Sequence, residues 1–172
     1  MSRRWRTSFA LLALLALAGL GPVPAEAAPQ VREEKAAGLV FLVPHNAEVT
    51  THLGEADDVS VVAITRREEV LLLTVYRGRQ RPRERAALDR HVTAFEREIS
   101  AQGKFSVRKF RQDLLDGKRP GREVLYTWMN RPHKAQIVSA RTSSMTVVTG
   151  WTRPADRPTD FAVRVLSTLR EE

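Results

Sequence analysis

Apolar side chains recur along the chain in two patterns, and these patterns predict where strands and helices lie. Short runs that are rich in β-branched and apolar residues are typical of strands. Such runs cover residues 38–43, 59–65, 70–76, 105–112, 123–130, 135–141 and 145–151. Apolar residues at intervals of three and four predict amphipathic helices over residues 83–101 and 161–169. Pro82 before the longer helical run and Gly103 after it are typical start and stop signals.

The order of these elements limits the fold class. Strands follow one another across short gaps, such as residues 131–134 and 142–144, and short gaps favour antiparallel neighbours. Residues 70–76 are mostly apolar at both odd and even positions, so this strand needs cover on both sides. The sequence therefore predicts an α+β fold, in which an antiparallel sheet of about six to seven strands is covered by helices on both faces.

The first residues have the layout of a secretory signal peptide. Three arginines among the first six residues precede an apolar run over residues 9–20, and Ala25 and Ala27 provide small residues for cleavage. The run is shorter than the roughly 20 residues that a membrane-spanning helix needs. The paired arginines also resemble a twin-arginine signal, although a third arginine stands where that signal is usually apolar. We expect a signal peptide over residues 1–27, and a periplasmic or extracellular protein that is soluble after cleavage near Ala27.

The rest of the chain has the size of one domain. We expect a linker or a short helical turn over residues 28–37 and a single α+β domain over residues 38–172. The chain has no cysteine, so we expect neither a disulfide nor a lipid-bearing cysteine. It also has no glycine-rich phosphate loop and no Gly-x-Ser-x-Gly elbow. We therefore expect no cofactor, and an enzyme is the second hypothesis rather than the first.

The chain is basic, with 28 Lys and Arg residues against 20 Asp and Glu residues. Without the leader, 25 basic residues remain against 19 acidic ones, which leaves a net charge of +6. Such a charge attracts anionic lipid, polysaccharide or nucleic acid. However, 23 of the 28 basic residues are Arg, a bias that a GC-rich genome produces without selection for binding. Because export also separates the protein from nucleic acid, we expect no nucleic-acid partner.

Three stretches and the order of the elements carry a resemblance to a known family. The stretches are GLVFLVP at residues 38–44, the pattern G-x-x-x-x-Y-x-W at residues 121–128, and the closing apolar run at residues 161–169. With them, the mature chain resembles the PsbP-like superfamily, which includes the extrinsic protein of the plant oxygen-evolving complex and many bacterial periplasmic proteins and lipoproteins. The resemblance implies an α/β/α sandwich and a non-enzymatic accessory or binding role. It carries over no functional residue.

A first candidate site is a metal site in the polar segment after residue 44. Imidazole and carboxylate groups bind transition metals when two or three of them converge. The segment offers His45, Glu48, His52, Glu55, Asp57 and Asp58. Their spacing is irregular and lacks His-x-x-x-His, so a solvated polar loop is the alternative. The candidate metal ligands are His45, His52 and Glu55.

A second candidate is a run of alternating arginines, which we call the arginine ladder. It consists of Arg77, Arg79, Arg81, Arg83 and Arg85. Five guanidinium groups in a loop that enters a helix can hold phosphate, sulfate or lipid headgroups. The last two lie near a helix N-terminus, where the dipole disfavours cations, so a solvated loop is again the alternative.

These observations lead to one leading hypothesis and two alternatives. The leading hypothesis is an exported, soluble accessory or binding protein with an envelope protein as its partner and no anchor after cleavage. The first alternative is a small envelope enzyme or metal-binding protein that uses residues 45–58. The second is an anion or lipid-headgroup binder that uses the arginine ladder on an anionic surface. His91 and the aromatic residues are expected to fill or border the core.

Overall fold

The computed structural model describes residues 30–54, 58–101, 103–115, 117–157 and 160–172. These residues form two antiparallel sheets and two helices, as expected for an α+β fold. The elements are β1 (Val31–Ala36), β2 (Leu39–Pro44), β3 (Glu48–Leu53), β4 (Val59–Arg66), β5 (Glu69–Tyr76), α2 (Glu84–Ser100), β6 (Ser106–Asp113), β7 (Lys118–Trp128), β8 (Arg131–Arg141), β9 (Thr146–Pro154), α3 (Asp160–Ser167) and β10 (Arg170–Glu171). Neither described helix is long and apolar enough to cross a lipid bilayer.

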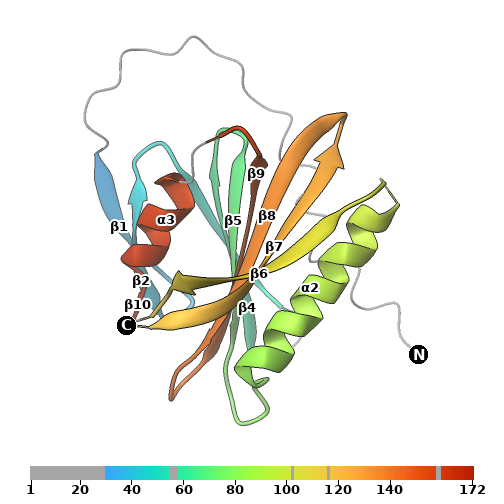
Figure 1. Cartoon of the computed structure of the whole chain (residues 1–172). Coiled ribbons are helices and arrows are strands. Elements are labelled where there is room, and N and C mark those ends of the chain that lie inside the picture. Colours follow the sequence, from blue (N-terminus) through green and yellow to red (C-terminus); the bar gives the residue numbers. More distant parts are fainter. Residues whose placement is uncertain (1–29, 55–57, 102, 116, 158–159) are drawn as a thin grey trace.

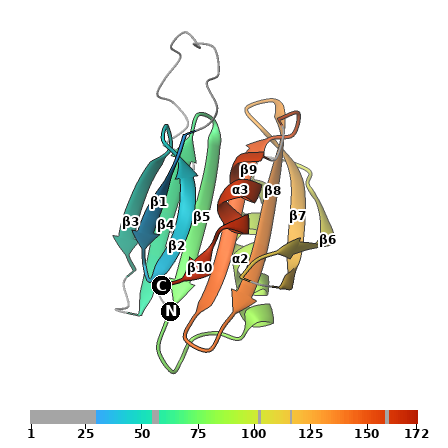
Figure 2. The same ribbon diagram turned by 90° about the vertical axis from the view of Figure 1, so that its left-hand side faces the viewer.

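The larger sheet has seven strands in the order β3-β4-β5-β9-β8-β7-β6. All of its neighbours are antiparallel, so the predicted antiparallel sheet is confirmed. Figure 1 shows this sheet with α2 beside β6, β7 and β8 and with α3 on the other side of the molecule. Figure 2 separates its two ends, with β3, β4 and β5 on one side of the view and β7 and β6 on the other.

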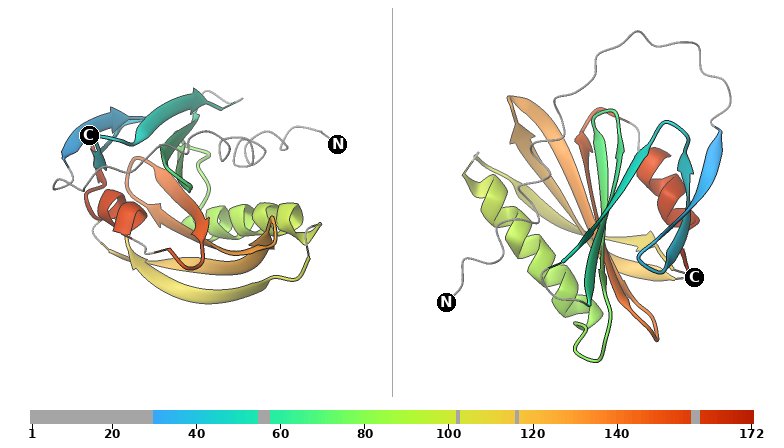
Figure 3. Two further views of the ribbon diagram at one scale, coloured as in Figure 1. Left: turned by 90° about the horizontal axis from the view of Figure 1, so that it is seen from above. Right: turned by 180° about the vertical axis from the view of Figure 1, so that it is seen from behind.

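Helix α2 covers one face of the larger sheet. Its sequence places apolar residues at helical spacing on a single side, and Leu88, Val92 and Phe95 are buried there. They pack with Val124 of β7 and Ile137 of β8. The views in Figure 3 show α2 on the side of the molecule away from α3, where it packs against β8, β9 and β7.

The opposite face is closed mainly by a second sheet rather than by a helix layer. The strands β1, β2 and β10 form this small sheet, and α3 packs against β2. Phe41 of β2 and Val165 of α3 share one apolar core with Leu71 and Leu73 of β5. The prediction of helices on both faces was therefore wrong. Strand β2 is buried along most of its length, so it lies within a packed layer. Its neighbours β1 and β10 pair with it, and this layer is therefore a sheet.

The predicted linker over residues 28–37 was also wrong where the structure describes it. Residues 31–36 form β1, which pairs with β2 along its whole length. Ala37 and Gly38 both have positive φ, 51° and 64°, as a two-residue hairpin turn requires. The sequence VREEKA did not indicate a strand because most of its residues are charged. The apolar stems of these long side chains can nevertheless cover apolar surface. Arg32, for example, bonds to the carbonyl oxygen of Ala47 at 2.9 Å.

Candidate functional site

The candidate metal ligands do not come together in the described part of the chain. His45 is exposed in the β2–β3 connection, and His52 is exposed on β3. Residues 48 and 52 of one strand are separated by about 13 Å, whereas metal–ligand bonds are about 2 Å long. Glu55 lies outside the described residues. Among the described residues, no three His, Asp or Glu side chains are placed to hold a metal ion.

The arginine ladder is divided by the fold. Arg77 donates to the carbonyl oxygen of Ala37, in the β1–β2 turn. Arg81 donates to the carbonyl oxygens of Gly78, at 3.0 Å, and Ser143, in the β8–β9 hairpin. These two guanidinium groups tie loops together. The other three ladder arginines, Arg79, Arg83 and Arg85, are exposed.

Charge is distributed unevenly between the two ends of the larger sheet. Residues 31–76, which include β1 to β5, carry eight acidic residues against four basic ones. Residues 77–172 carry 21 basic residues against 11 acidic ones. The excess is dense in residues 104–134, with nine basic residues against three acidic ones. This segment forms β6, β7 and the start of β8, so the charge gathers at one end of the sheet.

Strand β6 is the last strand at this end and is exposed along most of its length. Four exposed cations lie on it or beside it and make no ion pair with any described residue. We call these four residues the basic edge: Lys104, Lys109, Arg111 and Lys118. Sequence reasoning missed them because it looked for dense runs, whereas Lys109 and Arg111 are spaced along β6, Lys104 precedes that strand and Lys118 begins β7.

The register of β6 on β7 places like charges side by side. Lys109 lies directly opposite Arg122 in the antiparallel ladder. Opposed like charges destabilise a strand pair. The Asp89 carboxylate of α2 lies 3.7 Å from the Arg122 guanidinium and offsets that charge, and no described acidic side chain does the same for Lys109. The α2 face of β6 therefore keeps a net positive charge, with Lys109 and Arg111 against Asp113.

The opposite face of the same strands is electrostatically satisfied. Glu123 of β7 is 4% exposed, and its carboxylate accepts hydrogen bonds from Arg108 and, at 2.6 Å, from Gln136. The Lys134 ammonium lies 3.4 Å from the same carboxylate. Phe110 adds an apolar contact, because Gly121 has no Cβ that would meet its ring. Free charge therefore remains on the α2 face, where Lys109 and Arg111 lie.

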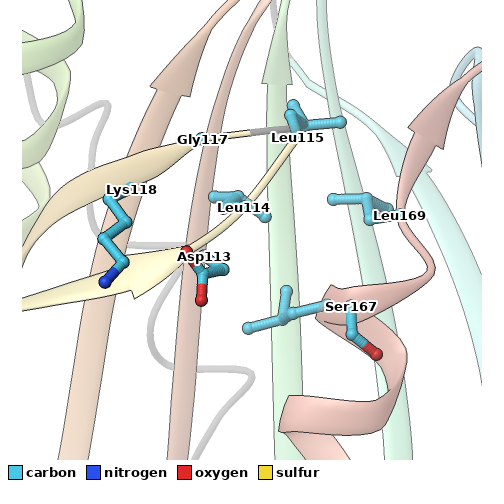
Figure 4. Close-up of a pocket in the computed structure, with 8 residues that line it drawn as sticks. Asp113, Leu114, Leu115, Gly117, Lys118, Ser167 and Leu169 are labelled. Carbon is cyan, nitrogen blue, oxygen red and sulfur yellow. The ribbon is translucent and has the colours of Figure 1, made fainter.

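An open hollow of about 460 Å³ lies between the β6–β7 hairpin and the end of α3. Figure 4 shows Leu114 and Leu115 of the hairpin facing Leu169. The Ser167 hydroxyl beside it donates to the carbonyl oxygen of Arg164 at 2.9 Å. The hollow is lined by Asp113, Leu114, Leu115, Gly117, Lys118, Leu166, Ser167 and Leu169. This lining provides no nucleophile paired with a base, so it gives no support to catalysis.

His91 of α2 and two tyrosines of the sheet, Tyr76 and Tyr126, pack between the helix and the sheet. His91 meets Tyr76 edge-on with ring centroids 6.0 Å apart, and its Nδ1 lies 3.1 Å from the Ala87 carbonyl oxygen. Burial lowers the pKa of His91 below its ordinary value. Burial also raises the pKa of Tyr126 to about 12. These shifts follow from desolvation in a core and do not indicate a reacting group.

Comparison with known proteins identifies a fold relative but no function. No protein-family model matches the chain, and no curated protein matches it. A solved structure of a protein from Bacteroides thetaiotaomicron VPI-5482 is similar, with a TM-score of 0.51 and 9% identity over 79% of this chain. The chain spans 46% of the length of that protein. At this identity the likeness concerns the fold alone, and the resemblance to the PsbP-like superfamily stays a prediction.

Proposed function

We propose that the chain is an exported, non-catalytic binding protein that docks onto an acidic protein partner in the cell envelope. The observation that supports this proposal is the basic edge, four exposed cations that make no ion pair with a described residue, although Lys118 lies opposite Asp113 in the ladder. The opposition of Lys109 and Arg122 costs folding free energy in the isolated protein. An acidic surface placed against the basic edge relieves this repulsion. The uncompensated charge thus favours an acidic binding partner.

The same observation separates this proposal from its two alternatives. The arginine ladder has two of its five guanidinium groups engaged by backbone carbonyl oxygens, so fewer charges remain for an anion. The metal-site hypothesis depends on Glu55 together with two histidines that lie apart. No geometric observation favours either alternative over the basic edge.

A charge-reversal experiment with the mature protein, residues 28–172, tests the binding role. The probe is poly-L-glutamate, and its binding is measured by calorimetry at several salt concentrations. We expect K109E/R111E to weaken binding about tenfold or more, because two attractive contacts become repulsive. Binding by the unaltered protein should also weaken with salt.

A matched control gives the same change of net charge at another place. Arg79 and Arg83 are exposed ladder residues, so R79E/R83E removes the same number of charges from the arginine ladder. Retained binding by this variant supports the basic edge. Equal losses in both variants would reduce the effect to net charge and contradict the proposal. A larger loss in the ladder variant would favour the anion-binding alternative.

Export is tested separately, because it depends on the leader. The chain is expressed with its leader, and the protein is recovered from the periplasm or the culture medium. We expect N-terminal sequencing to begin at Ala28, after cleavage of the signal peptide. Recovery in the cytoplasm with the leader intact would contradict the exported location.

A further inference from the structure

We infer that β6 is a strand-addition site, at which an extended acidic segment of the partner pairs with β6 as an eighth strand of the larger sheet. This inference rests on the proposed function and states how the partner binds. It depends on three features of the described residues: the free backbone of β6, the pattern of its side chains, and the contrast with β3 at the other end of the sheet.

The backbone of β6 has one side available for pairing. All eight residues of β6 pair with β7, and within the described chain β6 has no second neighbour. An edge strand presents unpaired N–H and C=O groups to solvent. An extended peptide can accept and donate the same ladder of hydrogen bonds that holds the other strands together. The exposure of β6 leaves room for such a peptide.

Side chains along β6 define the sequence that a paired segment should have. Successive side chains alternate between faces, so Val107, Lys109, Arg111 and Asp113 lie on the face toward α2. Directly opposed residues in neighbouring strands have Cβ atoms about 5 Å apart. An antiparallel segment whose first residue lies opposite Arg111 starts beyond Asp113 and then meets Lys109 and Val107, which is 40% exposed. The complementary pattern, read from its N-terminus, is Glu-x-Glu-x-Val.

The opposite edge strand explains why the site is specific. Strand β3 also ends the larger sheet and is largely exposed, but Glu48 is its charged residue at one end and the surrounding segment is acidic. An acidic segment is repelled there and attracted at β6. Two β6 strands repel each other in any register that opposes Lys109 or Arg111 to one another, which disfavours those pairings with a second copy. The charge on β6 therefore both protects the edge and selects an acidic strand.

The choice of a protein segment over a lipid or polysaccharide follows from the whole edge. An anionic polymer or membrane surface can bind the cations of this edge. It does not form a ladder of hydrogen bonds with the backbone of β6, and it does not cover the exposed side chains of Phe105 and Val107. An extended peptide uses all of these features at once. An edge strand that combines cations, exposed apolar side chains and unpaired backbone groups thus fits a peptide best.

The test uses three peptides with the mature protein and follows amide signals by nuclear magnetic resonance. The probe is acetyl-Thr-Glu-Thr-Glu-Thr-Val-Thr-amide. The second peptide, acetyl-Thr-Thr-Glu-Glu-Val-Thr-Thr-amide, has the same composition but places its two glutamates on opposite faces. The third has the probe sequence with every backbone nitrogen methylated, which keeps the charge and removes the hydrogen-bond donors.

Strand addition makes specific predictions for these peptides. We expect the second peptide, with its glutamates on opposite faces, to bind about three- to tenfold more weakly than the probe, because one charge contact is lost. We expect the methylated peptide to lose binding. At saturation with the probe, alternate amides within residues 106–113 should exchange with solvent at least about tenfold more slowly, because alternate N–H groups point to the new strand.

The outcomes distinguish this inference from the proposed function. If all three peptides bind equally and K109E/R111E weakens them equally, strand addition is wrong while the acidic-partner proposal stands. If neither the probe nor poly-L-glutamate binds, both are wrong. Binding to phosphatidylglycerol vesicles but not to the probe would identify a lipid surface and overturn the inference. The neutral variant K109Q/R111Q is expected to fold and to bind the probe more weakly than the unaltered protein. It therefore shows whether a loss of binding in K109E/R111E comes from the charges or from misfolding.

Discussion

The two ends of the larger sheet are built from the same kind of strand but organised differently. At the β3–β5 end, the inward side chains Val62, Ile64, Leu71 and Leu73 are fully buried beneath the small sheet. At the β6–β8 end, β6 is mostly exposed and carries unpaired cations. Both edge strands, β3 and β6, are largely exposed, but only the β6 edge carries exposed cations that make no ion pair with a described residue. Burial beneath the small sheet and accessible positive charge thus lie at opposite ends of one sheet, as the proposed binding role of β6 requires.

The largest expected effect on stability comes from making a cavity in the buried core at the β3–β5 end. Leu73 is fully buried in β5, so Leu73→Ala removes apolar contacts and leaves a cavity. We expect a loss of about 2–5 kcal/mol in the free energy of unfolding, measured by urea denaturation. Val107→Ala at the exposed edge is the control and should cost less than about 0.5 kcal/mol. Similar costs for both variants would mean that the two ends do not differ in this way.

The next effect tests the buried carboxylate at the basic end. Glu123→Gln keeps the side-chain shape but replaces an acceptor oxygen by an NH₂ group facing Arg108 or Lys134. Because both cations can still reach water, we expect a loss of about 1–3 kcal/mol rather than the full cost of an isolated buried charge. Glu48→Gln on exposed β3 is the control. A loss no larger than that of the control would show that Glu123 does not hold the basic end together.

The elements that were predicted correctly share one property. Strands β4, β5, β8 and β9 and helix α2 bury apolar residues at a regular period, which sequence patterns detect. The strands β1 and β3 were missed because polar and charged side chains dominate them, and their strand geometry comes from pairing with β2 and β4. Pairing partners distant in sequence are invisible to a local pattern.

The candidate site was less predictable than the fold for the same reason. The opposition of Lys109 and Arg122 depends on the register of β6 on β7, and the neutralisation of Arg108 depends on Glu123, 15 residues away. The arginine ladder was easy to find in the sequence, yet Arg77 and Arg81 bond to turns that only the fold brings near. Charge in a sequence therefore does not tell which cations stay free.

A buried histidine gives a smaller, pH-dependent effect. His91 of α2 meets Tyr76 of β5, and burial lowers the pKa of His91, so the unfolded chain binds a proton more readily than the folded one. The free energy of unfolding should therefore fall as the pH drops below about 6.5. His91→Gln should flatten this part of the pH profile, measured by thermal unfolding. An unchanged pH profile in His91→Gln would contradict the assignment to His91.

The smallest expected effect has opposite signs at the two ends. Lys109→Thr removes the repulsion with Arg122 and should stabilise the fold by about 0.2–1 kcal/mol. Lys35→Thr in the small sheet removes an exposed ion pair with Glu172, 3.1 Å long, and should cost about 0.2–1 kcal/mol. The free energy of unfolding of Lys35→Thr should therefore lie about 0.4–2 kcal/mol below that of Lys109→Thr. Both variants exchange lysine for threonine in a strand, so the gain in strand propensity is common to both and cancels in the comparison. The measurement is urea denaturation at low salt, where surface charges act most strongly. If Lys109→Thr is the less stable variant, Lys109 is not under electrostatic strain and the main support for an acidic partner is lost. If it is the more stable variant and also binds poly-L-glutamate more weakly, then the chain keeps a destabilising charge at β6 that only a bound partner can use.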